Sequence, residues 1–535
     1  MAFCEECGAK LSPGARFCEE CGTPVPDEAN SSARVSPPDK NWYNSFAVFK
    51  SVNWETEWRA VASEGCGEEL GIILTCEASL VAQLALDADA LHDILGEYMR
   101  QADKRGVHYY YLDLENNAIQ GGLSGENVAE IVALLRKVVD VARPKYIFIL
   151  GNEEIIDVAT WENQSSDGDD EVFSDLVYST LDTISPWEGQ EFNASEALRV
   201  GRLPTTNGCA DDFRAYFENA IHGIGCIDSI HPYGLSALVW EAESNEEYSA
   251  VSDSNVSTCP KVTLEDMDEE LAEADANLLF FNLHGSNDTE YWYGQKGGSY
   301  PEAVSPDVFR DYPGFFFLGV EACYGARYIG LEPGESIVKT ALANKCLAFL
   351  GSSKIAYGTS EPEGTCADIV IGDFIRQIAK GETAGDAHLA GLKRLTSNSD
   401  MDDSDIKTLA EFSLYGDPSA CTGKNRNVGA MKGMMKKLGG VPKGIHIPMP
   451  DVRRATKLYL TEIDAKLESA IDDFVASKLM PDILQKGLAV EQKTFSIPNK
   501  KLFQKLYSVD AGPVRQIARV YFDGTGKIHK ALLSK

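Results

Sequence analysis

The sequence lacks the features that would place this chain in a membrane, outside the cell or on a nucleic acid. No run approaches the roughly 18 consecutive apolar residues of a membrane-spanning helix. The first residues, MAFCEECGAK, have neither the basic start nor the apolar core of a secretory signal peptide. Positive charge is also scarce, because 49 Lys and Arg residues face 82 Asp and Glu residues. We therefore expect a cytoplasmic globular protein with no membrane or nucleic-acid partner.

The negative charge is distributed unevenly along the chain. Residues 1–422 carry 28 basic and 72 acidic residues, whereas residues 423–535 carry 21 basic and 10 acidic ones. The basic C-terminal segment could therefore dock on the acidic body of its own chain or on an acidic regulatory protein. A separately evolved, solvated domain is an equally good interpretation, and both stay open.

The chain is long enough for several domains, since 535 residues correspond to three or four units of ordinary size. Composition and pattern divide it into four segments. Residues 1–25 are rich in cysteine, and residues 26–64 form a linker and lead-in segment rich in Pro, Ser and Asn. Residues 65–422 alternate strands with helices. Residues 423–535 form the basic C-terminal domain.

Cysteine usage indicates metal binding and free thiols rather than a disulfide framework, because the chain has 13 cysteines and no export signal. Cys4 and Cys7 form one CxxC knuckle, and Cys18 and Cys21 form a second, each followed by Gly. Two such knuckles supply four thiolates for one tetrahedral Zn²⁺. The segment resembles a zinc ribbon. It leaves no open coordination position, so the zinc would be structural and the module would contact proteins.

The long central segment predicts an α/β fold. Buried strands are expected at residues 71–76, 107–114, 145–150, 235–240, 278–283, 315–320 and 346–350. Helices are expected at 80–104, 126–142, 209–224, 262–273, 334–344, 365–380 and 384–395. Alternation of this kind favours a doubly wound, mostly parallel sheet flanked by helices.

The C-terminal segment has a different pattern, typical of a small α+β domain. Residues 423–448 predict a loose connector rich in Gly, Lys and Met, and 452–479 predicts a long amphipathic helix capped by Asp451. The last stretch predicts a β-hairpin around Asp523-Gly524-Thr525-Gly526.

Two of the central strands end in reactive residues. The strand at 278–283 runs into His284-Gly285, and the strand at 315–320 runs into Glu321-Ala322-Cys323-Tyr324-Gly325. Side chains just past the carboxyl ends of neighbouring parallel strands line the ligand crevice of a doubly wound sheet. A Cys and a His in that position suit a thiol nucleophile with a nearby proton carrier. The glycines would let backbone N–H groups approach an oxyanion.

The two strand ends, His-Gly and Glu-Ala-Cys-Tyr-Gly, resemble the catalytic pair of the caspase-like cysteine peptidases, and the segment around them resembles the gingipain-like branch. The further matches are Ile149–Asn152, Ser174–Tyr178, Val200–Pro204 and Leu414-Tyr415-Gly416-Asp417-Pro418-Ser419, in the family's order. The resemblance covers about 70–422. It implies a caspase/gingipain-like sheet, with the zinc ribbon and the α+β domain attached to it.

The same resemblance implies roles for single residues. Cys323 would be the nucleophile and His284 the proton donor to the leaving amine, with Gly285 and Cys323 supplying the oxyanion hole. Family members also have an acidic residue near the His and another in the primary specificity pocket. Within the acidic loop expected at Glu241–Asp253, after the strand at 235–240, Glu243 is the candidate His partner. Asp253, and after it Glu241, are the candidates for the pocket.

These features together predict an intracellular cysteine endopeptidase that cleaves peptides or proteins after Arg or Lys. A regulatory protein bound by the ribbon or the tail, and self-processing in the basic connector, are further hypotheses. The alternative is a catalytically weak peptidase-fold adaptor that binds proteins through the ribbon and tail. The acidic loop 167–171 could hold Ca²⁺, although a hydrated loop explains it better.

Overall fold

The computed structural model describes residues 43–58, 69–190, 192–397, 401–423, 458–484 and 486–535. Residues 45–535 belong to one compact unit and residues 1–44 to another. The predicted zinc ligands and the connector at 424–448 lie outside the described residues. The structure therefore bears on the large α/β block and the C-terminal domain.

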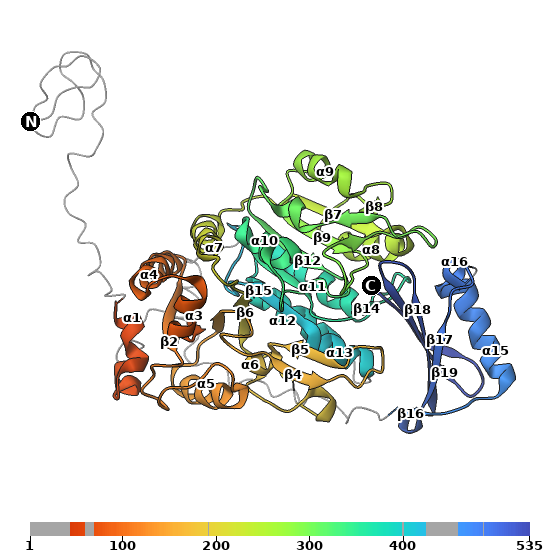
Figure 1. Ribbon diagram of the computed structural model, residues 1–535, viewed down its shortest axis with the longest axis horizontal. Coiled ribbons are helices and arrows are strands. Elements are labelled where there is room, and N and C mark those ends of the chain that lie inside the picture. The colour runs from red at the N-terminus through yellow and green to blue at the C-terminus, as the bar shows by residue number, and fades with distance from the viewer. Residues whose placement is uncertain (1–42, 59–68, 191, 398–400, 424–457, 485) are drawn as a thin grey trace, which may run out of the picture. The chain divides into compact units, whose positions relative to one another are not determined.

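A ten-stranded sheet forms the centre of the α/β block (Figure 1). Its order is β2-β1-β3-β6-β15-β13-β12-β9-β7-β8. The strands are β1 (Glu69–Thr75), β2 (Val107–Asp113), β3 (Tyr146–Leu150), β6 (Arg199–Leu203), β7 (Pro232–Ala237), β8 (Ser257–Cys259), β9 (Leu278–Asn282), β12 (Phe316–Val320), β13 (Cys346–Ser352) and β15 (Phe412–Gly416). Only the β13–β15 pair of this sheet is antiparallel. The prediction of a mostly parallel sheet is confirmed.

Helices flank this sheet. They include α3 (Glu77–Leu84), α4 (Ala88–Lys104), α5 (Val128–Ala142), α6 (Leu176–Thr180), α7 (Ala210–Gly223), α8 (Glu241–Tyr248), α9 (Met267–Glu273), α10 (Ile337–Ala343), α11 (Ala367–Lys380), α12 (Ala384–Thr396) and α13 (Asp403–Glu411). Helix α11 packs on β9 and β12, and α7 and α10 pack on β13. Strands β9 and β12 are buried along their whole length, which explains why both read as continuous apolar runs.

Two predicted elements of the block differ from the structure. The single helix expected at 80–104 is two helices, because Ala85 adopts a left-handed conformation and the Asp87 side chain caps the N-terminus of α4. The strand expected at 235–240 ends at Ala237. The segment after it, expected to be an acidic loop, forms α8 with Glu243 and Glu247 on its buried face.

The C-terminal domain is built on a second sheet, of order β14-β20-β19-β18-β17-β16. Its strands are β14 (Tyr357–Gly358), β16 (Tyr459–Leu460), β17 (Glu491–Ile497), β18 (Leu502–Asp510), β19 (Arg515–Asp523) and β20 (Ile528–Ser534), with α15 (Ala465–Phe474) and α16 (Pro481–Leu484) beside them. The predicted hairpin is the β19–β20 pair. The helix predicted at 452–479 is wrong at its start, because Tyr459 and Leu460 form a strand and α15 begins after its cap at Asp464.

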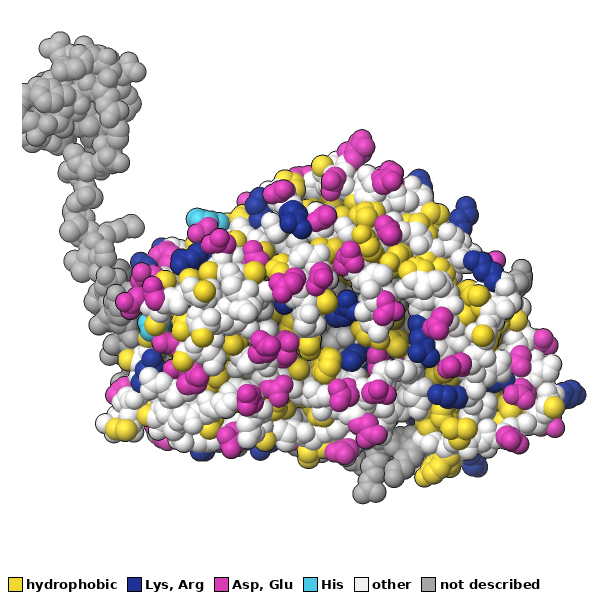
Figure 2. Space-filling model, viewed as in Figure 1, with side chains coloured by type: hydrophobic (Ala, Val, Ile, Leu, Met, Phe, Trp, Pro, Cys, Tyr) yellow, Lys and Arg dark blue, Asp and Glu magenta, His cyan; other side chains and the backbone are white. Residues whose placement is uncertain are grey.

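The first strand of this second sheet belongs to the α/β block, so the sheet crosses the boundary that was predicted at 422. Apolar residues from both sides form one core, which includes Tyr357, Cys366, Ile517 and Leu532. Buried charges also cross the boundary: Arg519 on β19 pairs with Asp403 and with Asp167 at 3.4 Å. On the face shown in Figure 2, acidic side chains lie scattered among basic and hydrophobic ones. The C-terminal domain therefore docks by apolar packing and by buried ion pairs.

Candidate active site

His284 and Cys323 stand at the ends of β9 and β12, which are parallel neighbours in the sheet. His284 is held by two main-chain hydrogen bonds of 2.8 Å with Tyr293. The next residue, Gly285, lies directly against the Cys323 backbone, since a Cβ there would be 1.6 Å from Cys323 O. Only glycine allows this approach. The structure thus brings together the two strand ends that the sequence singled out.

The His284 ring is buried and has partners from both domains. Its Nε2–H donates to Gln295 Oε1 at 2.7 Å, and Gln516 Nε2 of β19 lies 3.1 Å from the same ring nitrogen. The Trp240 ring packs on it with centroids 4.4 Å apart. Burial lowers the pKa of His284 to about 4, although the Gln295 bond opposes the shift. The imidazole is therefore neutral at physiological pH.

Cys323 is buried as well, with 3% of its surface exposed. Its thiol donates to Ala356 O at 3.6 Å, and burial raises its pKa above the usual value. Tyr324, which follows it, has a φ of +51°, a left-handed conformation that is uncommon outside glycine. Such strained turns occur at functional sites, where they fix the direction of a neighbouring side chain.

The main chain of Lys535 reaches this pair. Cys323 N–H donates to the Lys535 main-chain oxygen at 3.2 Å, and Lys535 N–H donates to Ala356 O at 3.0 Å. The Lys535 main chain also lies beside the His284 ring, where it opposes the fall of the imidazole pKa. A carbonyl group thus lies between the N–H of one candidate catalytic residue and the side chain of the other.

The Lys535 side chain enters a buried cluster of three carboxylates. Its Nζ lies 2.8 Å from Asp368 Oδ1, 3.2 Å from Glu321 Oε2 and 3.6 Å from Glu243 Oε2. All four side chains are inaccessible to solvent. Burial opposes the charge on Lys535, but the carboxylates raise its pKa above the usual value. Burial, together with neighbouring carboxylates, likewise raises the pKa of Glu243 and Glu321.

The cluster receives side chains from three elements. Glu321 follows β12, Glu243 lies on α8, and Asp368 lies in the first turn of α11. Asp368 Oδ2 accepts the N–H groups of Thr359 and Thr365 at 2.9 Å each, and these bonds fix its carboxylate. Among the described residues, these three carboxylates are the group that could also hold a metal ion. The Lys535 ammonium stands where such an ion would bind.

The other residues predicted from sequence lie elsewhere. Glu243 belongs to the carboxylate cluster and accepts a hydrogen bond of 2.7 Å from Asn282, and no hydrogen bond joins it to His284 in the described structure. Glu241 and Asp253 are exposed, at the start of α8 and in the loop after it. Within the acidic loop, Asp167 and Asp169 each lie 2.7 Å from Lys407 Nζ. Calcium at this loop would have to compete with that buried cation.

Sequence reasoning missed Glu321 and Asp368. Glu321 could have been found, because it lies two residues before Cys323 in the same motif. Asp368 is one of many acidic residues, and no local pattern distinguishes it. Gly358 was missed too: a Cβ at this position would lie 2.0 Å from Lys535 Cε. It is the residue that leaves room for the Lys535 side chain.

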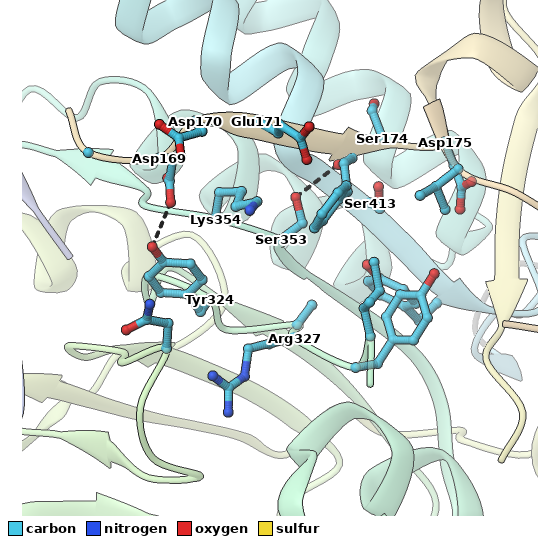
Figure 3. A pocket seen from close by; sticks show the side chains of 18 residues that line it. Asp169, Asp170, Glu171, Ser174, Asp175, Tyr324, Arg327, Ser353, Lys354 and Ser413 are labelled. Carbon is cyan, nitrogen blue, oxygen red and sulfur yellow. Dashed lines mark hydrogen bonds between the residues drawn. The ribbon is translucent and has the colours of Figure 1, made fainter. Parts of the chain in front are cut away.

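A separate open cavity of about 620 Å³ begins at Tyr324, next to the candidate nucleophile. Figure 3 shows its polar lining, in which the Tyr324 hydroxyl donates to Asp169 Oδ1 at 2.6 Å. Lys354 and Arg327 line this cavity together with Asp169, Asp170 and Glu171, which lie at the start of β5 (Glu171–Ser174) and just before it. Cys323 and His284 do not line this cavity, so it lies beside the pair rather than around it.

All eight cysteines that the structure describes are free. Of the helices in the described ranges, none has the length and apolar character required to cross a bilayer.

Comparison with known proteins gives two kinds of match. The family model of the zinc-ribbon domain matches residues 3–25, which contain Cys4, Cys7, Cys18 and Cys21. Four thiols are a donor set suited to structural Zn²⁺. No curated protein matches the sequence.

The chain is similar to several solved structures. One is the Arg-specific cysteine proteinase gingipain R, at 10% identity and a TM-score of 0.49, with 88% of this chain and 92% of that chain covered. A chain described as a protease gives 10% identity and a TM-score of 0.45 over 86% and 96%. A complex of the pro- and mature domains of RgpB from Porphyromonas gingivalis gives 10% identity and a TM-score of 0.47 over 86% and 99%.

Proposed function

We propose that this protein is a cysteine endopeptidase that hydrolyses peptide bonds after Lys or Arg. Cys323 is the nucleophile and His284 the proton carrier. The observation that supports this most directly is the placement of Lys535. Its main-chain oxygen accepts from Cys323 N–H at 3.2 Å, while its ammonium lies 2.8 Å from Asp368. A peptide bound in the same way would present a carbonyl to the thiol and a basic side chain to the carboxylates.

The chemistry follows from these positions. The thiol proton passes to His284, and Sγ attacks the carbonyl carbon of the residue that precedes the scissile bond. The carbonyl oxygen becomes an oxyanion, which the N–H groups of Cys323 and Gly285 stabilise. His284 gives its proton to the leaving amine as the C–N bond breaks and a thioester forms. Water then attacks the thioester, which releases the carboxylic acid and restores the thiol.

The preference for a basic residue before the scissile bond rests on charge. Three carboxylates line one buried pocket, so a cation gains most there, and an acidic side chain would meet like charges in a low-dielectric site. The pocket that we assign to this role consists of Glu243, Glu321 and Asp368. Asp253, the first candidate from the sequence, is exposed and lies outside it.

Covalent probes test this function even if turnover is slow. Chloromethyl ketone peptides that carry Lys, Arg, Asp or Ala next to the warhead are incubated with Lys535→Ala, in which the carboxylate pocket is vacated, and with the same variant carrying Cys323→Ala. Adducts are located by peptide mass mapping. We expect the Lys and Arg probes to label Cys323, whereas the Asp probe and the Cys323→Ala variant give no adduct at this site. The adaptor alternative predicts equal, slow labelling by all four probes.

Intact mass also tests self-processing in the connector at Lys424, Arg426, Lys436 or Lys437. The purified chain is compared with Cys323→Ala after long incubation. Fragments that appear only with Cys323 present support the hypothesis, and one intact mass in both samples refutes it under those conditions.

A further inference from the structure

We propose that the segment Leu533–Lys535 occupies the substrate-binding groove of its own chain, with Lys535 held in a lysine-binding pocket of Glu243, Glu321, Asp368 and Trp240. While bound, the segment keeps the enzyme latent. The latency rests on the function proposed above. The binding of Leu533–Lys535 in this pocket can be tested independently of peptidase activity.

The first line of support is the main chain. Strand β20 pairs antiparallel with β14, with Ser534 opposite Tyr357 and Leu533 opposite Gly358. Lys535 N–H extends the pairing to Ala356 O at 3.0 Å. Extended peptides bind many proteins by adding a strand to a sheet edge, where main-chain bonds give affinity and side-chain pockets give specificity. The pairing ends at Ala356, whose main-chain oxygen also accepts a hydrogen bond from the Cys323 thiol at 3.6 Å.

The second line of support is the fit of the side chain. Three carboxylate oxygens lie within 3.6 Å of Lys535 Nζ, so the ammonium group is held by ion pairs. The Trp240 ring adds a cation–π contact, with Nζ 4.5 Å from the ring centroid. Gly358 leaves space for the aliphatic part, because a Cβ there would overlap Lys535 Cε. The pocket is thus shaped for a long unbranched side chain with one terminal cation.

The third line of support is that the same domain covers the catalytic pair. Gln516 on β19 lies 3.1 Å from His284 Nε2 and also donates to Gln295 Oε1 at 3.1 Å. Cys323 itself belongs to the apolar core shared with β17–β20. A substrate chain cannot bind along β14 while β20 is paired with it. Because β20 is tethered, its effective concentration at the groove is on the order of millimolar or more, and a competing substrate must exceed it.

The experiment compares the full chain with Lys535→Ala and with the matched control Lys527→Ala. Lys527→Ala removes the same charge, and Lys527 lies exposed at the β19–β20 turn, outside the groove. Two rates are measured for each protein: iodoacetamide alkylation of Cys323, by peptide mapping, and hydrolysis of a fluorogenic peptide ending in Leu-Ser-Lys. Circular dichroism and the melting temperature show whether each variant is folded.

We expect Lys535→Ala to raise the alkylation rate of Cys323 about a hundredfold, because it leaves three buried carboxylates without their cation and frees the strand end. The control should keep the slow rate of the parent chain. A synthetic peptide of residues 528–535, added to Lys535→Ala, should slow alkylation again, and the same peptide ending in Ala should not. Protection by the added peptide also distinguishes an open groove from a partly unfolded variant, because the peptide would not protect Cys323 in an unfolded site.

The outcomes separate the two proposals. Faster alkylation of Lys535→Ala together with new hydrolysis supports both. Faster alkylation without hydrolysis supports the intramolecular occupant and refutes the peptidase function. Equal hydrolysis by all three proteins supports the peptidase and overturns the latency. Alkylation that is equally slow in all three proteins, or no protection by the lysine peptide, overturns the occupancy itself.

Discussion

The space that Gly358 leaves in the lysine pocket gives the sharpest prediction of specificity. A methyl group at this position would lie 2.0 Å from Lys535 Cε and 2.2 Å from Asp368 Oδ1. Non-bonded carbon atoms approach to about 3.5 Å, so the lysine has to withdraw by more than an ångström. Asp368 cannot move away, because two main-chain N–H groups hold its carboxylate. Gly358→Ala should therefore exclude lysine from the pocket, whether from β20 or from a substrate.

The magnitude follows from the buried ion pair. Removing one partner of such a pair costs about 3–5 kcal/mol, which corresponds to a factor of roughly 10² to 10⁴ in binding or in kcat/KM. The assay uses the Lys535→Ala background, in which the groove is free. Adding Gly358→Ala should lower kcat/KM for a lysine substrate by at least about 10²-fold, while iodoacetamide alkylation of Cys323 stays fast.

The matched control is Gly314→Ala in the same background, because a Cβ at position 314 would meet no atom within 4 Å. It should leave both rates unchanged. Normal cleavage of lysine peptides by the Gly358→Ala protein would refute the pocket as drawn here.

Three further predictions concern other groups. In the Lys535→Ala background, Asp368→Asn should lower kcat/KM for lysine substrates by about 10²-fold, whereas Asp253→Asn should leave it unchanged because that side chain is exposed; the reverse result would restore the assignment made from sequence. In the Lys535→Ala background, replacing Cys4 and Cys7 by Ser should release zinc, measured by atomic emission, while lysine-peptide cleavage survives; loss of cleavage would make the ribbon part of the catalytic unit. Burial lowers the pKa of His388 from 6.5 to about 4, so its neutral form stabilises the fold fully above pH 6.5 and progressively less as pH falls toward 4. Urea unfolding should therefore show that His388→Gln lowers the free energy of unfolding by about 2 kcal/mol less at pH 5 than at pH 7. An equal loss at both pH values would contradict the buried neutral imidazole.

Local sequence patterns were sufficient to predict the sheet and the placement of His284 and Cys323 at neighbouring strand ends. Strands β9 and β12 are short apolar runs that end at polar residues, and their parallel pairing brings His284 and Cys323 to the same edge. The β19–β20 hairpin was also visible, because Asp523-Gly524-Thr525-Gly526 carries its own turn signal. In each case the information lies within about ten consecutive residues.

The pocket could not be predicted, because its parts come from distant segments. Glu243, Glu321 and Asp368 lie on three different elements, and only the folded sheet brings them together. Helix α8 holds Glu243 on its buried face, whereas Asp253 lies in the loop after the helix and is exposed.

Strand pairing between domains was equally hidden. Strand β14 is two residues long and too short to give a pattern, and its partner β20 lies more than 170 residues further along the chain. The basic charge of the C-terminal domain did suggest docking on the acidic body. It could not show that one lysine would enter a buried pocket, since that depends on the register of a single strand.

The most direct test of the central claim is the cleavage of a fluorogenic Leu-Ser-Lys peptide by Lys535→Ala, measured beside the same variant carrying Cys323→Ala or His284→Ala. We expect clear turnover by the first protein and loss of turnover in the other two, with all three equally folded. Turnover that persists without Cys323 would contradict the assignment of this thiol as the nucleophile, and with it the catalytic site described here.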